Sequence, residues 1–110
     1  MNKKLVIIES PFAGDQRRNI CYARACLRDS LFRGEFPFAS HLLYTQEGAL
    51  DDNNPKERKL GIEAGLAWAK HADLIAVYTN LGISKGMKIG IAAAKAAGRT
   101  VEFRSLPGEW

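Results

Sequence analysis

The stretch Leu5-Val-Ile-Ile-Glu-Ser-Pro-Phe-Ala-Gly-Asp15 decides the fold of this 110-residue chain. Its four consecutive apolar residues, three of them β-branched, are typical of a parallel strand buried on both faces. The Ser, Pro, Gly and Asp that follow break the strand. Ligands of open α/β sheets bind beyond the carboxyl ends of strands, so we expect residues 10–15 to form the floor of a ligand site. The alternative is that this loop only connects a strand to a helix.

The next part of the chain predicts a helix and a second strand. Helical spacing extends over residues 15–32, starting at an aspartate that suits an N-cap and stopping before Gly34. Residues 36–44 indicate a short strand that runs into a loop, which would place His41 and Tyr44 near its carboxyl end. A single histidine beside apolar residues is more often structural than catalytic, and both roles stay open for His41.

A polar turn at residues 51–55 separates this strand from a second helix, expected over residues 55–71 with Asn54 as its N-cap. The adjacent acids Asp51 and Asp52 either face a ligand, cap the helix or are solvated, and the last two roles together are favoured. Two glycines would let the helix lie close to a sheet or to another helix. Its apolar stripe is expected at Leu60, Ala64, Ala67 and Trp68.

The last third of the chain repeats the pattern with a strand at residues 73–79, a helix from about Ser84 to Ala96 and a strand at residues 100–104. Strands that alternate with helices predict an α/β, Rossmann-like three-layer sandwich. We expect four or five mainly parallel strands, in the order 2-1-3-4 for the first four, with helices on both faces.

Composition indicates one ordinary domain spanning residues 1–110, with 46% hydrophobic and 25% charged residues. No apolar run approaches the roughly 20 residues that cross a bilayer, and no signal-peptide pattern precedes the first strand, so we expect a cytoplasmic protein without a membrane partner. The formal net charge is +4, but basic residues are interleaved with acids, so a nucleic-acid partner is not expected.

Metal and cofactor binding are not expected. Cys21 and Cys26 lie five residues apart on a predicted helix and point in different directions, so they cannot form a metal pair by themselves. We expect both to be reduced core thiols. The two histidines, His41 and His71, are not surrounded by further ligand residues.

Several segments together resemble the nucleoside 2-deoxyribosyltransferase superfamily. They are residues 10–15 with Asn19 and Ala23, residues 73–79, and residues 83–90 with Ala94, Gly98, Arg99 and Val101. A small branch found in phages and bacteria is similar in two further features, the histidine-containing segment at residues 40–44 and an acidic turn followed by an arginine, here Arg58. The resemblance covers roughly residues 4–103.

This resemblance implies a flavodoxin-like core, a homodimer or larger oligomer, and cleavage or exchange of the N-glycosidic bond of nucleosides or nucleotides. A neighbouring subunit would close the shallow pocket, with Trp68 or the turn at residues 51–55 near the interface. The implied chemistry uses a carboxylate nucleophile that forms a glycosyl-enzyme intermediate. That carboxylate is normally a Glu at the start of the last helix, and its position falls on Lys88 here. An ammonium group cannot make this attack.

Glu9, at the carboxyl end of the first strand, stands where the family more often has a small or neutral residue. One interpretation is an ion pair between Glu9 and Lys88 across the mouth of the pocket. The other is that Glu9 is a relocated nucleophile. The ion pair is favoured, because a nucleophile on another element would also have to recover its angle to the sugar.

The leading functional hypothesis is binding without catalysis of a nucleotide, or of an ADP-ribose-derived signal that a phage protein would sequester from host defence, in the host cytoplasm. Ribose and phosphate would contact Ser10, Asp15, Asn19 and the amides of residues 84–87. His41 or Tyr44 would contact the base or a second phosphate, and Lys88 would add a positive charge for an anionic ligand. The alternatives are an active N-glycosidase or deoxyribosyltransferase that uses Glu9 or a loop aspartate, and a purely structural role. The complete set of expected ligand-binding residues is Ser10, Pro11, Phe12, Gly14, Asp15, Asn19, His41, Tyr44, Arg58, Ser84, Gly86, Met87 and Lys88.

Overall fold

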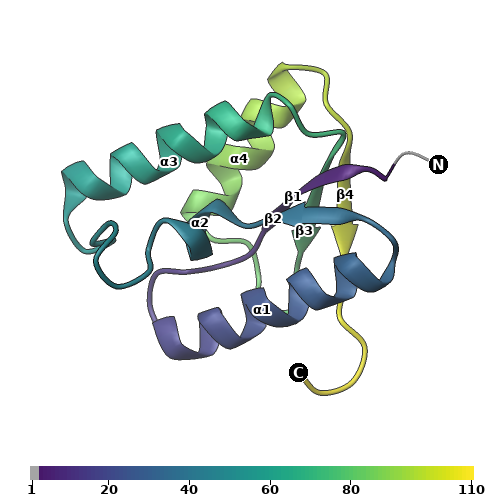
Figure 1. Cartoon of the computed structure of the whole chain (residues 1–110), viewed down its shortest axis with the longest axis horizontal. Helices are drawn as coiled ribbons and strands as arrows, with labels where there is room; N and C mark the ends of the chain where they lie inside the picture. The colour runs from purple at the N-terminus through teal and green to yellow at the C-terminus, as the bar shows by residue number, and fades with distance from the viewer. Residues whose placement is uncertain (1–2) are drawn as a thin grey trace.

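The computed structural model describes residues 3–110 and contains a sheet of four parallel strands (Figure 1). The strand order is β2-β1-β3-β4, with Leu5 opposite Phe36 and Val6 opposite Leu74. This confirms the expected parallel sheet and its order, and no fifth strand is present within residues 3–110. Met1 and Asn2, which belong to the expected domain, lie outside the described residues. The strands are β1 (Leu5–Glu9), β2 (Phe36–Phe38), β3 (Leu74–Tyr78) and β4 (Val101–Arg104).

Helices cover both faces of the sheet. Helix α1 (Gln16–Phe32) lies on one face, and α3 (Pro55–Ala69) and α4 (Lys85–Ala96) lie on the other (Figure 1). Successive residues of a strand point to opposite faces, so β1 and β3 contribute to two separate apolar clusters. The cluster under α1 contains Tyr22 and Cys26, and the cluster under α4 contains Met87, Ile91 and Ala94.

A side-chain cap fixes the start of each of the three long helices. Two of these caps were expected from the sequence, and the third, at α4, was not. The Asp15 carboxylate accepts a hydrogen bond from the Arg18 amide at 3.1 Å. Asn54 accepts from the amides of Lys56 and Glu57 ahead of the first turn of α3, and Ser84 accepts from the Met87 amide at the start of α4. Each cap acts within three residues, which is why the sequence was enough to locate those at Asp15 and Asn54.

The expected strand over residues 36–44 is wrong beyond Phe38. Residues Ser40–Leu43 form a short helix, α2, in which the Leu43 amide donates to the Ala39 carbonyl at 3.0 Å and the Tyr44 amide donates to Ser40 at 2.9 Å. Strand β2 is at the sheet edge and pairs only with β1, so the chain satisfies its backbone groups locally once that pairing ends. His41 therefore lies on a helical turn.

The expected apolar stripe of α3 is also displaced. Leu60 and Trp68 are each 55% exposed, while Ile62, Leu66 and Ala69 face a cavity above the sheet. The helix packs mainly against α2 and α4, and this rotates the expected stripe away from the core. One cysteine expectation is wrong as well, because Cys26 is buried but Cys21 is exposed.

No helix within residues 3–110 has both the length and the apolar character that a membrane span requires.

Candidate ligand-binding site

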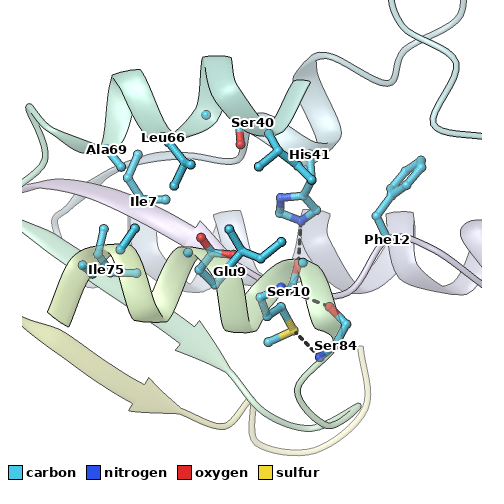
Figure 2. Close-up of a pocket in the computed structure, with 18 of the residues that line it drawn as sticks. Ile7, Glu9, Ser10, Phe12, Ser40, His41, Leu66, Ala69, Ile75 and Ser84 are labelled. Carbon is cyan, nitrogen blue, oxygen red and sulfur yellow. Dashed lines mark hydrogen bonds between the residues drawn. The ribbon is translucent and has the colours of Figure 1, made fainter. Parts of the chain in front are cut away.

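A cavity of about 400 Å³ lies between α3 and α4, above β1 and β3 (Figure 2). This volume is within the range of small-molecule sites, roughly 300–1,000 Å³. Its polar end is at the carboxyl end of β1, where an open α/β sheet is expected to bind its ligand. Most of its wall is hydrocarbon, contributed by Ile7, Ile62, Leu66, Ala69, Ile75, Ile89 and Ala93.

Glu9, the last residue of β1, contributes a carboxyl group to this cavity (Figure 2). The side chain packs onto Gly90 of α4, and a Cβ atom at Gly90 would overlap the carboxyl group. The salt bridges found within residues 3–110 do not include Glu9. Burial without a compensating charge raises the pKa of Glu9 to about 8. At neutral pH the group is therefore mostly a neutral acid.

The favoured ion pair between Glu9 and Lys88 is wrong. Lys88 is exposed and does not line the cavity. A helix turns about 100° per residue, so the residue two positions before Gly90 points to nearly the opposite side of α4. Met87 and Ile91 are buried in the core, and their burial fixes this rotation. The expected contact between Lys88 and an anionic ligand stays a prediction, and the shape of this cavity gives it no support.

Ser10 and His41 form a hydrogen-bonded pair at the polar end of the cavity. The Ser10 Oγ and His41 Nε2 atoms are 2.7 Å apart, and Ser10 is 4% exposed. Desolvation lowers the pKa of His41 to about 4, so the imidazole is neutral at physiological pH. Figure 2 shows the second ring nitrogen on the side of the ring away from Ser10. A ligand could use that nitrogen as a hydrogen-bond partner.

An ion pair forms part of the rim. The Arg58 Nη1 atom lies 2.9 Å from the Asp52 carboxylate, and both residues line the cavity. The neighbouring Asp51 instead accepts a hydrogen bond from the Asn53 amide at 3.0 Å. Of the two acids in this turn, one therefore stabilises the turn and the other holds Arg58 beside the cavity. Lys70 and Arg99 also lie in the lining.

Several expected site residues in and just after the loop at residues 10–15 stabilise the loop and do not line the cavity. Asn19 donates from Nδ2 to the carbonyl oxygens of Phe12 and Ala13 at 2.9 and 3.1 Å, which fixes the loop over the start of α1. Asp15 caps that helix. Neither side chain reaches the cavity lining, and the same is true of Pro11 and Gly14.

The cavity thus brings together seven of the thirteen expected ligand-binding residues, together with Glu9. Tyr44 lies in an adjoining hollow of about 70 Å³ and accepts a hydrogen bond from Trp68. Sequence reasoning missed the apolar walls, although the spacing of Ile62, Leu66 and Ala69 along one side of a helix is the signal that could have shown one of them. The seven residues in the lining are Ser10, Phe12, His41, Arg58, Ser84, Gly86 and Met87.

Seven of the thirteen expected ligand-binding residues therefore line the cavity, and Glu9 is the eighth expected site residue in its wall. Gly90 was not among the expected residues, although its lack of a side chain makes room for the Glu9 carboxyl group. That requirement depends on how α4 packs against β1, so no local pattern in the sequence could have revealed it.

Comparison with known proteins places this site in a recognisable fold. Residues 4–104 match the model of a family described as "Domain of unknown function (DUF7768)". The chain belongs to this family. No curated protein matches the chain.

Two solved structures share the fold. A 2-deoxyribosyltransferase from Bacillus psychrosaccharolyticus is 21% identical with a TM-score of 0.64, and the match covers 96% of this chain and 75% of that chain. A CMP N-glycosidase from Clostridium botulinum is 14% identical with a TM-score of 0.56, and the match covers 97% of this chain and 76% of that chain. These likenesses confirm the deoxyribosyltransferase-like α/β fold that the sequence resemblance implied.

Proposed function

We propose that this protein binds a nucleoside or nucleotide-type small molecule in the cavity between α3 and α4, without cleaving it. The observation that carries the proposal is the convergence of Glu9, Ser10 and His41 at one end of an apolar cavity of about 400 Å³. The hydrocarbon walls suit the flat face of a base, and the polar end suits sugar hydroxyl groups. The nucleoside chemistry named for the two fold neighbours supports this choice of ligand class.

Binding is favoured over catalysis because the start of α4 offers no carboxylate to the cavity. The residue at the expected nucleophile position is Lys88, which is exposed. Arg58 and the hydroxyl of Ser84 are available for a phosphate group near the rim. Binding without cleavage would keep a nucleotide or ADP-ribose-derived signal away from its receptor. We propose this sequestering role for a phage-encoded member of the family.

The test combines thermal-shift and base-release assays on one panel of nucleosides, nucleotides and NAD-derived cyclic nucleotides. We expect stabilisation by at least one compound without release of free base. Ala93→Phe would fill part of the cavity and should abolish the shift, whereas Ala92→Phe is the matched control, because Ala92 lies next to Ala93 on the same helix but does not line the cavity. A panel that gives no shift at all would refute the proposed function.

An active N-glycosidase is the second candidate, and one observation favours it. Glu9 has a pKa of about 8 and lines the cavity, which suits an acid that donates a proton to a leaving base at neutral pH. If the wild-type protein releases free base, Glu9→Gln should abolish release while ligand binding persists. Release that survives Glu9→Gln would exclude Glu9 from the chemistry.

A further inference from the structure

Within residues 3–110, the Glu9 carboxyl group forms no salt bridge with the charged residues around the cavity. The titratable and charged residues lining the cavity are His41 on α2, Arg58 and Lys70 at α3, Asp52 in the preceding turn and Arg99 after α4. His41 is paired with Ser10, and Arg58 is paired with Asp52. No salt bridge to Glu9 is found within residues 3–110. Within the described part of the chain, a ligand in the cavity therefore meets an acid that no salt bridge engages.

We propose that Glu9, as a neutral carboxylic acid, pairs with the amidine edge of an adenine or cytosine base. This inference rests on the proposed function and names the class of nucleoside that the cavity selects. The pairing would place the base between the hydrocarbon side chains of α3 and α4, such as Leu66 and Ala93, which line the same cavity.

The pairing follows from the donors and acceptors on each side. A neutral carboxylic acid presents one O–H donor beside one carbonyl acceptor. Adenine and cytosine present a ring nitrogen that accepts beside an exocyclic amine that donates, so two hydrogen bonds form together. On its Watson–Crick edge guanine presents two adjacent donors, which suit a carboxylate instead, and a carbonyl oxygen as the acceptor. Uracil and hypoxanthine would offer the acid proton only a carbonyl oxygen, which is less basic than the ring nitrogen of an amidine.

The apolar surroundings increase the contribution of this pairing to binding affinity. A base that fills the space between the hydrocarbon walls would displace the water that competes for the carboxyl group, and a polar group that then lacks a partner is costly. Gly90 leaves open the space that the carboxyl group occupies, since a Cβ atom there would overlap the Glu9 side chain. The acid is therefore positioned before the ligand arrives, which lowers the entropic cost of binding.

The pairing also predicts how affinity depends on pH. The pKa of Glu9 is about 8 in the free protein, so affinity for adenosine should be constant below that pH and fall above it as the acid ionises. Glu9→Gln provides the matched control. A carboxamide presents the same donor beside an acceptor but does not titrate, so its affinity should not change over this range.

The experiment is calorimetric titration of the full chain, first with adenosine, cytidine, uridine, inosine and guanosine at pH 6.5. Adenosine and cytidine should bind at least about tenfold more tightly than the other three, which corresponds to one net hydrogen bond. Adenosine is then titrated at pH 6.5 and at pH 9.5 into the wild type, Glu9→Gln and Glu9→Leu. The wild type should lose about tenfold or more in affinity at the higher pH, Glu9→Gln should lose none, and Glu9→Leu should bind weakly at both.

Two results would overturn the inference while leaving the proposed function intact. One is binding of uridine, inosine or guanosine as tight as that of adenosine and cytidine. The other is adenosine affinity in the wild type that does not change with pH and is matched by Glu9→Leu. A melting temperature for each variant at pH 6.5 shows that it is folded. If no compound of the nucleoside and nucleotide panel stabilises the wild type, the proposed function fails and the inference fails with it.

Discussion

Glu9 and His41 affect stability in opposite directions, and pH can separate the two effects. The pKa of Glu9 is raised from 4.5 to about 8, so its contribution to stability is full below pH 4.5 and is lost as pH rises through 8. The pKa of His41 is lowered from 6.5 to about 4, so the folded state loses stability as pH falls below 6.5. Between pH 6.5 and 8, Glu9 contributes more than His41 to the pH dependence of stability.

A first prediction concerns that pH interval. The free energy of unfolding of the wild type should fall by up to about 2 kcal/mol between pH 6.5 and 8, since each unit of pKa difference is worth about 1.4 kcal/mol. Glu9→Gln should remove most of this fall, because the carboxamide stays neutral. Urea unfolding at the two pH values measures both. Equal falls in the two proteins would show that Glu9 ionises in the folded state as freely as in the unfolded chain.

Arg104 is the residue that ties the end of β4 to the segment after α1, and it supports a second prediction. It is 6% exposed and donates to both carboxylate oxygens of Glu35 at 2.8 and 2.7 Å, which lowers the pKa of Glu35. Arg104→Ala leaves Glu35 without its counter-ion and should cost about 3–5 kcal/mol of unfolding free energy. The lowered pKa means that the stability from this pair is present above pH 4.5 and is lost as pH falls below it.

Arg33 provides the matched control for Arg104. It forms an ion pair with Asp29 at 2.8 Å, but its side chain is 42% exposed. Arg33→Ala should therefore cost less than about 1 kcal/mol in the same denaturation experiment. Comparable losses for the two variants would mean that burial does not set the strength of the Arg104 pair.

At the scale of elements, the contact between α2 and α3 depends on one glycine. A Cβ atom at Gly65 would lie 2.5 Å from Ser40 Oγ and 3.0 Å from Ser40 Cβ, so Gly65→Ala should push α2 away and distort the cavity wall that carries His41. We expect a net loss of about 1–3 kcal/mol in thermal or urea unfolding. Ser40→Ala in the same chain should recover part of this loss, because it removes the closer of the two atoms.

Gly61, one turn earlier in α3, is the control for Gly65. A Cβ atom there would meet only the end of the Leu50 side chain at 3.3 Å, which can move. Gly61→Ala should be neutral or stabilising by up to about 1 kcal/mol, because alanine has the higher helix propensity. Equal destabilisation by both substitutions would show that the contact with Ser40 is not the cause.

The same elements show how far sequence reasoning reaches. The strand order and the caps Asp15 and Asn54 were predictable, because burial patterns and caps act locally or through general topology rules. Helix α2 was not predictable, because a short apolar segment is compatible with a strand or a helix and its tertiary contacts determine which one forms. Lys88 was misplaced for a different reason. Its direction depends on the rotation of α4, which is set by the burial of Met87 and Ile91 against the sheet.

At the scale of the whole molecule, apolar side chains remain exposed around one edge of the sheet. Trp68 of α3 packs on Phe38 of β2 with ring centroids 5.5 Å apart and donates a hydrogen bond to the Tyr44 hydroxyl at 2.7 Å, yet it is 55% exposed. A large aromatic side chain held in a fixed position on the surface is typical of the centre of a protein interface. Phe36 and Leu60, also exposed, belong to the same two elements.

We therefore expect a homodimer that uses Trp68. Light scattering on the wild type at micromolar concentration should give twice the chain mass of 12.2 kDa, and Trp68→Ala should give a monomer, because removal of an interface tryptophan commonly costs more than about 2 kcal/mol of binding free energy. Trp110→Ala is the control. Trp110 packs against Tyr22 of α1 with ring centroids 4.8 Å apart, on the other face of the sheet, so its loss should leave the dimer intact. A wild-type mass of 12.2 kDa would contradict the expected dimer, and the cavity would then have to bind its ligand within a single chain.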